Sequence, residues 1–341
     1  MQRRQWWMVG LLALGIVGGA RAALLVNGAG ATFPYPLYSK WFDEFHKRNP
    51  DMQINYQSIG SGGGIRQVLE GTIDFGATDG PMTDEQLKTA KIPILHLPTV
   101  LGAVVPTFNL TGVDHLRFSP DALAGILLGK VTHWNDPAIA RDNPGTALPA
   151  AAIVPIHRSD GSGTTYIFTD YLSKVSAEWQ KGVGRGTSVN WPVGLGGKGN
   201  EGVAGLVKMT PNAIGYVELI YAVGNKLPYG DVRNRSGRFV QATLDSVTAA
   251  AAAAAENMPE DFRVSITDAV APDAYPISSF TWLLVPTRIQ DGAKGAAIKK
   301  FLGWMLADGQ KLAPPLNYAP LPQPVVTLEQ RALDKIQVGG G

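Results

Sequence analysis

Three stretches of this chain repeat one pattern: a short apolar strand, a loop rich in glycine and hydroxyl residues, and a helix. The clearest one follows the apolar run 151–156, continues as His157-Arg158-Ser159-Asp160-Gly161-Ser162-Gly163-Thr164-Thr165, and leads into an amphipathic segment at 166–175. The other two loops run through residues 28–33 and 58–64. Repeated strand–loop–helix units are typical of α/β proteins, whose ligand sites lie at the carboxyl ends of the strands. The sequence therefore predicts an α/β fold.

The loop at 157–165 carries three kinds of hydrogen-bond donor for an anion. They are the guanidinium of Arg158, the hydroxyls of Ser162 and Thr164, and the backbone N–H groups that a helix leaves unpaired at its start. Gly163 has no Cβ, so a ligand can approach the backbone closely. The loop fits a small tetrahedral oxyanion. Taken alone, it is equally compatible with an ordinary strand-to-helix turn with a Ser or Thr cap.

The two other loops place hydroxyl groups at helix starts as well. Pro34 and Pro36 open a helical pattern directly after Thr32 and Phe33, and Ser61 precedes a helix with an apolar face. Three helix N-termini, each with its positive dipole end, could converge on one oxyanion. This recurrence favours a binding pocket over three unrelated turns.

Asp79 ends the apolar strand 73–78, and Thr83 with Gln86 then forms the signature of a helix capping box. The end of such a strand is where open α/β sheets hold ligands, so Asp79 is a candidate site residue. An aspartate in a plain turn remains the alternative.

The length of 341 residues favours two domains. Two long extended apolar stretches, 94–110 and 275–286, are candidate crossovers between them. They divide the chain into a first lobe of residues 23–104 and 279–341 and a second lobe of residues 105–278.

Two further segments carry no predicted function. The glycine-rich stretch 191–200 fails the nucleotide-loop pattern, because Pro192 stands at the first glycine position and Gly199 follows Lys198. We interpret it as a flexible loop leading to a helix at 201–208. The alanine run 249–255 predicts a surface helix.

Residues 1–22 have the layout of a signal peptide. Arg3 and Arg4 precede an apolar run, and the segment closes on Ala20-Arg21-Ala22. The apolar run is too short for a comfortable membrane span. The flanks of the arginine pair favour the general secretory route over twin-arginine export. The sequence thus predicts an exported periplasmic protein.

Charge and composition exclude several classes of function. Removal of Arg3, Arg4 and Arg21 lowers Lys+Arg from 30 to 27 against 28 Asp+Glu, so the net charge passes from +2 to −1, and no nucleic-acid partner is expected. The absence of cysteine excludes disulfides and an N-terminal lipid anchor. The five histidines lack metal-site spacing, so we expect no metal and no cofactor.

The chain resembles the periplasmic phosphate-binding proteins of bacterial phosphate ABC transporters. The motifs that carry the resemblance are, in order, Gly28-Ala29-Gly30-Ala31-Thr32-Phe33-Pro34, Asp74-Phe75-Gly76-Ala77-Thr78-Asp79, Arg158-Ser159-Asp160-Gly161-Ser162-Gly163-Thr164 and Gly215-Tyr216-Val217-Glu218. The resemblance implies a two-lobed, type II-like periplasmic binding protein. Each lobe would be a sheet flanked by helices, two crossover strands would join the lobes, and phosphate would lie in the cleft.

By matching motif positions, the resemblance also implies a set of ligand contacts. These are Thr32, Phe33 through its N–H, Ser61, Asp79, Arg158, Ser162, Gly163 and Thr164, with Asp160 holding Arg158. The implied function is non-enzymatic: the protein would bind inorganic phosphate and deliver it to an inner-membrane ABC permease, acting as a monomer.

Asp79 would supply selectivity, because a carboxylate can accept a hydrogen bond from a protonated phosphate but not from sulfate at neutral pH. Two alternatives stay open: a receptor for another oxyanion such as sulfate or molybdate, and a phosphoester hydrolase with Ser162 as nucleophile and His157 as base. Asp160 occupies the first glycine position of a nucleophile elbow, which weakens the hydrolase hypothesis.

Overall fold

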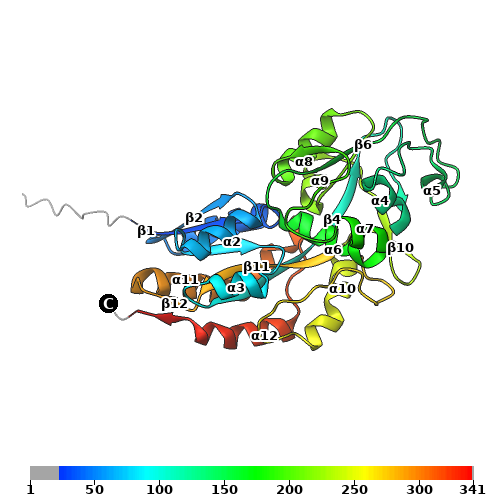
Figure 1. The fold of residues 1–341 in the computed structure, drawn as a ribbon. Coiled ribbons are helices and arrows are strands. Elements are labelled where there is room, and N and C mark those ends of the chain that lie inside the picture. The colour runs from blue at the N-terminus through cyan, green and yellow to red at the C-terminus, as the bar shows by residue number, and fades with distance from the viewer. Residues whose placement is uncertain (1–22, 340–341) are drawn as a thin grey trace, which may run out of the picture.

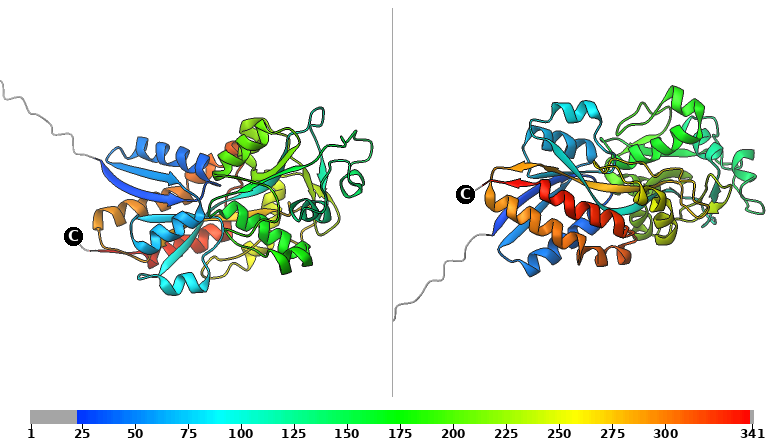
Figure 2. Two further views of the ribbon diagram at one scale, coloured as in Figure 1. Left: turned by 45° about the horizontal axis from the view of Figure 1, so that its top comes forward. Right: turned by 90° about the horizontal axis from the view of Figure 1, so that it is seen from below.

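The structure is a computed structural model that describes residues 23–339, so the predicted signal peptide lies outside the described residues. Figure 1 shows two lobes side by side. The described chain begins and ends on the first lobe, at the end away from the second lobe, and this holds in all three ribbon views (Figures 1 and 2). Among residues 23–339 no helix is both long and apolar enough to cross a bilayer.

The strands are β1 (Leu24–Gly30), β2 (Met52–Ser58), β3 (Phe75–Thr78), β4 (Ile94–Phe108), β5 (Arg117–Phe118), β6 (Val154–Arg158), β7 (Leu195–Gly197), β8 (Ala213–Glu218), β9 (Asp231–Arg233), β10 (Phe239–Val240), β11 (Ser278–Pro286), β12 (Arg288–Ile289) and β13 (Gln337–Val338). The α-helices are α1 (Tyr35–Arg48), α2 (Ser61–Glu70), α3 (Asp84–Thr89), α4 (Pro120–Leu127), α5 (Pro137–Ala140), α6 (Gly163–Val175), α7 (Ala177–Gly182), α8 (Gly199–Met209), α9 (Leu219–Asn225), α10 (Leu244–Glu256), α11 (Gly292–Leu306) and α12 (Gln323–Ala332).

Eight strands form one hydrogen-bonded sheet in the order β2-β1-β3-β11-β4-β8-β6-β7. The crossover strands β4 and β11 are antiparallel to each other and lie in the middle of this order. The partner of β4 changes within the strand: Ile94–Ala103 pairs with β11, and Val104–Phe108 pairs with β8. The two lobes therefore share their sheet through the crossovers, a continuity that the prediction of one sheet per lobe did not include.

The helices of the first lobe form where the apolar spacing predicts them. α1 buries Tyr38, Trp41, Phe42 and Phe45 on one face, at helical spacing. The ring centroids of Phe42 and Phe301 of α11 lie 5.3 Å apart, so α1 and α11 meet through aromatic side chains. The predicted capping box at the start of α3 is confirmed.

Two segment predictions need correction. Residues 195–197 of the stretch interpreted as a flexible loop form β7, which pairs in parallel with β6. Helix α8 begins at Gly199, two residues earlier than predicted, which brings Asn200 into its first turn. The alanine run does form a helix, but α10 buries Ala250, Ala251 and Ala255 and packs against β4, β11 and α12. It is thus a half-buried helix that also touches the first lobe.

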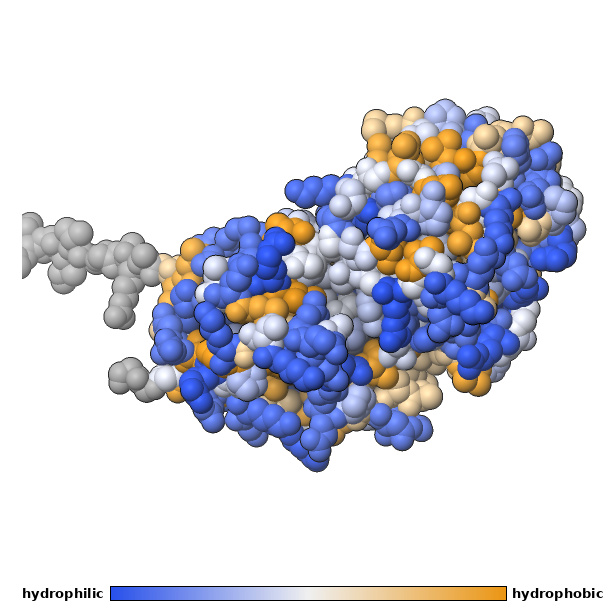
Figure 3. Space-filling model, in the orientation of Figure 1, coloured by the Kyte–Doolittle hydropathy of each residue, from blue (hydrophilic) through white to orange (hydrophobic). Residues whose placement is uncertain are grey.

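Figure 3 shows hydrophilic side chains over most of the visible face, with apolar groups in scattered places. The large apolar side chains most exposed among the described residues, Met209 and Val270, lie on separate segments. We find no broad apolar surface on this face.

Candidate functional site

The loop between β6 and α6 brings a cation to a helix start. Arg158 ends β6 and is 3% exposed. Ser162 caps α6, because its Oγ accepts the Thr165 N–H at 3.0 Å. The N–H groups of Gly163 and Thr164 belong to the first turn, where a helix offers no carbonyl partner of its own. An arginine and the N–H groups of a helix start therefore lie within seven residues of the chain, from Arg158 to Thr164.

Asp160 holds the Arg158 guanidinium from one side. Arg158 Nε donates to Oδ1 at 2.7 Å and Nη2 donates to Oδ2 at 2.5 Å, while the Gly199 N–H donates to Oδ1 at 3.0 Å. Burial alone would raise the pKa of Asp160, but the hydrogen bonds and charge of Arg158 outweigh burial and hold this pKa below its ordinary value. Asp160 is thus an ionised anchor, and Arg158 Nη1 extends toward Thr164 Oγ1 at 3.3 Å.

Asp79 faces this loop from the carboxyl end of β3 and is 1% exposed. Its Oδ1 accepts the Thr281 hydroxyl at 2.7 Å, and its Oδ2 lies 3.4 Å from Ser61 Oγ. Burial raises the pKa of Asp79 to about 7, against the lowering effects of the Thr281 hydrogen bond, the Arg158 charge and the Ser61 hydrogen bond. This carboxyl group is therefore poised between its two protonation states near neutral pH.

The starts of α2 and α6 lie against each other. A Cβ on Gly163 would fall 2.4 Å from both Asp79 Oδ2 and Ser61 Oγ, so only glycine fits there. The Gly62 N–H also donates to the Gly161 carbonyl at 2.9 Å. These contacts join two segments about 100 residues apart in the sequence.

Thr32 and Phe33 lie before α1, buried, with both carbonyls engaged. Tyr221 donates to the Thr32 carbonyl at 2.6 Å, and Tyr318 donates to the Phe33 carbonyl at 2.6 Å. In a trans peptide the C=O and the following N–H point in opposite directions. Since the Thr32 carbonyl faces Tyr221, the Phe33 N–H points away from Tyr221.

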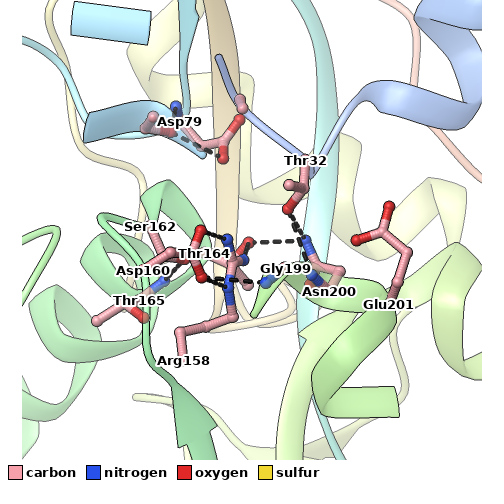
Figure 4. A network of polar contacts seen from close by, with 12 residues as sticks. Thr32, Asp79, Arg158, Asp160, Ser162, Thr164, Thr165, Gly199, Asn200 and Glu201 are labelled. Atoms are coloured by element: carbon pink, nitrogen blue, oxygen red, sulfur yellow. Dashed lines mark hydrogen bonds and ion pairs between the residues drawn. The ribbon is translucent and has the colours of Figure 1, made fainter. Parts of the chain in front are cut away.

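Figure 4 shows much of this group as one polar network. The structure brings together the predicted residues Thr32, Ser61, Asp79, Arg158, Asp160, Ser162, Gly163 and Thr164, with Phe33 next to Thr32. These predicted residues include one guanidinium, that of Arg158, and two carboxyl groups, those of Asp79 and Asp160. Any affinity for an anion must therefore come largely from N–H and O–H dipoles. The role of these residues as ligand contacts stays a prediction.

The geometry gives little support to a hydrolase. The His157 ring stacks on Trp191 with centroids 4.8 Å apart, and its Nδ1 lies 3.0 Å from the Arg158 carbonyl oxygen. Within residues 23–339, Ser162 has no hydrogen bond to a histidine. The same residues contain no group of three or more His, Asp or Glu that could hold a metal ion.

Comparison with known proteins decides the family. The profile of the PBP superfamily domain matches residues 17–309. The phosphate-binding protein PstS of Xylella fastidiosa is 46% identical over 88% of this chain and 82% of its own length. PstS of Haemophilus influenzae is 40% identical over 96% of both chains. The chain belongs to the PstS family of the PBP superfamily.

A solved structure agrees with this assignment at the level of the fold. The phosphate-binding protein from Stenotrophomonas maltophilia superposes on this chain with a TM-score of 0.69 at 20% identity, and the match covers 90% of this chain and 93% of that one. The predicted two-lobed binding-protein fold is confirmed.

In this PstS-family protein, the sequence did not point to Asn200. Its side chain donates to Thr32 Oγ1 at 2.8 Å and to Thr164 Oγ1 at 3.1 Å, so it joins two of the predicted loops (Figure 4). The local signal is an asparagine directly after Gly199, in a stretch whose glycine content predicts a flexible loop.

Thr281 was missed as well. It lies on β11, about 200 residues from Asp79, and its hydroxyl is the closest hydrogen-bond partner of the Asp79 carboxyl group. A threonine inside a buried apolar strand was a weak signal, because threonine is also favoured in strands for its shape.

Proposed function

We propose that this protein binds inorganic phosphate in the periplasm and delivers it, as a monomer and without catalysis, to an inner-membrane ABC permease. The proposal rests on one observation above all. Arg158, the first turns of α2 and α6, and the carboxyl group of Asp79 lie close together, where the two lobes meet. The names of the PstS relatives support the same ligand.

The donors match a tetrahedral oxyanion. Arg158 Nη1, the N–H groups that begin α6, the Phe33 N–H and the hydroxyls of Thr32 and Thr164 are the proposed contacts, along with Ser61 and Ser162. Helix N-termini bind phosphate groups through such N–H groups and their dipoles. Since Asp160 neutralises Arg158, these dipoles would carry most of the binding.

Asp79 supplies the proposed selectivity. Its Oδ1 is occupied by Thr281, which leaves Oδ2 to accept a hydrogen bond from a protonated phosphate oxygen. Sulfate carries no proton at neutral pH, so an ionised Asp79 would face it as a buried, unpaired negative charge. Such burial costs about 1–3 kcal/mol or more, which would disfavour sulfate.

Binding would also close the two lobes. We propose the division into residues 23–104 with 279–341 and residues 105–278, so that Thr32, Ser61 and Asp79 come from one lobe and Arg158, Ser162, Gly163 and Thr164 from the other. An anion held from both sides favours the closed arrangement, which a permease can distinguish from the open one.

The test is calorimetric titration of the purified protein with phosphate and with sulfate at pH 8.5, where Asp79 is ionised. We expect tight phosphate binding, weak sulfate binding, and an at least tenfold smaller phosphate-to-sulfate affinity ratio in Asp79→Asn. An unchanged ratio would remove Asp79 from this role. Stronger binding of sulfate or molybdate than of phosphate would favour a different receptor, and turnover of a chromogenic phosphoester would favour a hydrolase.

A further inference from the structure

The hydroxyl of Thr32 is saturated as an acceptor. Its Oγ1 receives the Asn200 side-chain N–H at 2.8 Å and the Asn200 backbone N–H at 3.4 Å. A hydroxyl oxygen has two acceptor positions and one hydrogen to donate. Both acceptor positions are thus engaged, and within residues 23–339 this hydroxyl has no protein acceptor for its hydrogen.

The hydroxyl of Thr164 also accepts two hydrogen bonds. Its Oγ1 receives Asn200 Nδ2 at 3.1 Å and Arg158 Nη1 at 3.3 Å. Thr164 is fully buried and Thr32 is 3% exposed. Within the part of the chain that the structure describes, Thr164 Oγ1 also makes no hydrogen bond as a donor. A buried hydroxyl hydrogen without an acceptor is costly, so each of these two hydrogens needs a partner from outside the protein.

The orientation of the Asn200 amide follows from its third contact. The Glu218 backbone N–H, which can only donate, lies 3.0 Å from Asn200 Oδ1. The oxygen of the amide must therefore face Glu218, and its NH₂ group must face the two threonines (Figure 4). Asn200 is fully buried, so water does not compete for these contacts.

We propose that Asn200 is a positioning residue that makes Thr32 and Thr164 hydrogen-bond donors toward the bound anion. By donating to both hydroxyl oxygens, the amide leaves their hydrogens with one direction in which to find an acceptor, which is the ligand. This inference rests on the proposed function. It explains how two residues that could equally accept hydrogen bonds act together as donors in a site whose one acceptor for the ligand is Asp79.

The experiment is a mutant cycle on phosphate affinity, measured by calorimetry with the full mature chain. Asn200→Ala should weaken phosphate binding at least about tenfold, since two donors to a charged ligand lose their orientation. In the Thr32→Val/Thr164→Val background the same Asn200→Ala change should cost less than about threefold, because no hydroxyl remains to be oriented. An equal cost in both backgrounds would overturn the inference.

Asn234→Ala is the matched control. Asn234 is buried in the second lobe, and its Nδ2 donates to two carbonyls, Pro272 at 2.9 Å and Ala274 at 3.1 Å, while its Oδ1 also accepts backbone N–H groups. This variant should lower the melting temperature and leave phosphate affinity unchanged. Should Asn200→Ala not fold, Asn200→Ser, which keeps a small polar group beside the Glu218 N–H, takes its place in the cycle.

The outcomes separate the two proposals. Absence of phosphate binding in the unmodified protein contradicts the proposed function. Phosphate binding in that protein together with an additive cycle contradicts only the role of Asn200.

Discussion

Two carboxyl groups of the site, the buried Asp79 at the end of β3 and the partly buried Asp160 after β6, have opposite environments. Asp160 receives two hydrogen bonds from Arg158 and one from the Gly199 N–H, and its pKa is held below the ordinary value even though burial raises it. Asp79 receives its closest hydrogen bond from the Thr281 hydroxyl and forms no ion pair within residues 23–339, and burial raises its pKa to about 7.

The contrast shows that the surroundings of an aspartate decide its protonation behaviour. An aspartate in contact with arginine stays ionised and positions its partner, whereas an aspartate that is buried among hydroxyls can hold or lose a proton near neutral pH. In the proposed site, the first fixes the cation that attracts the anion and the second responds to the proton that the anion carries. The predictions below separate these roles.

The largest effect is expected from breaking the Arg158–Asp160 pair. Arg158→Ala removes the guanidinium of the predicted site and leaves the partly buried Asp160 without its cation, so phosphate binding should weaken by at least about 2–3 kcal/mol. Isothermal titration measures this loss. Arg185→Ala is the control, since Arg185 pairs with the buried Asp170 at 2.7 Å outside the site and should affect stability alone. Affinity in Arg158→Ala equal to that of the unmodified protein would contradict the assignment.

Sulfate binding should depend on pH through Asp79. A protonated Asp79 can donate to a sulfate oxygen, whereas the ionised form repels it, so sulfate affinity should rise as pH falls through about 7. Between pH 8.5 and pH 5.5 we expect an increase of about tenfold or more, since one proton is taken up with the anion. In Asp79→Asn this dependence should disappear. Sulfate affinity that does not change with pH in the unmodified protein would contradict the titration of Asp79 in this range.

Asp160→Asn should leave selectivity intact. The change loosens Arg158, whose charge acts on phosphate and sulfate alike, so the two affinities should change in parallel and their ratio should stay within about threefold. Paired calorimetric titrations with both anions give the ratio. A fall in the phosphate-to-sulfate affinity ratio as large as in Asp79→Asn would mean that the two carboxyl groups do not have separate roles.

The smallest effect concerns stability without phosphate. Because the folded-state pKa of Asp79 is raised from 3.8 to about 7, its contribution to stability is complete below pH 3.8 and is lost as pH rises from there to about 7. Asp79→Asn does not ionise, so its melting temperature should exceed that of the unmodified protein by a few °C at pH 8 and by clearly less near pH 5. Scanning calorimetry measures the difference, with the exposed Asp51→Asn as control. A gain that is equal at both pH values would argue against ionisation as its cause.

Local signals predicted much of the fold. The apolar face of α1, the capping box at Thr83 and the long apolar run that forms β4 depend on neighbours within a few residues, and the structure confirms all three. The glycine-rich stretch 191–200 predicts a flexible loop, and this prediction is wrong at β7 and at the start of α8. Pairing with β6 orders a stretch whose own composition favours flexibility.

Some residues of the candidate site could likewise be predicted from local sequence, and others could not. The residues that follow strands and precede helices, such as Ser61, Arg158 and Ser162, stand out because each loop carries its own donors. The sequence does not single out Thr281, Tyr221 and Tyr318, since each contacts a segment 189 to 285 residues away. It does not single out Asn200 either, since that side chain contacts two distant segments at once.

The sequence by itself determined which residues can donate to an anion and that three of their loops begin helices, because those properties are local to the chain. Only the tertiary structure decided how their hydrogens and protons are arranged. The burial that raises the pKa of Asp79 and the amide contacts that fill the acceptor positions of Thr32 and Thr164 both arise where distant segments meet. Desolvation and the direction of a hydrogen bond depend on which side chains pack around a group, and the sequence of one loop does not specify its neighbours from other segments.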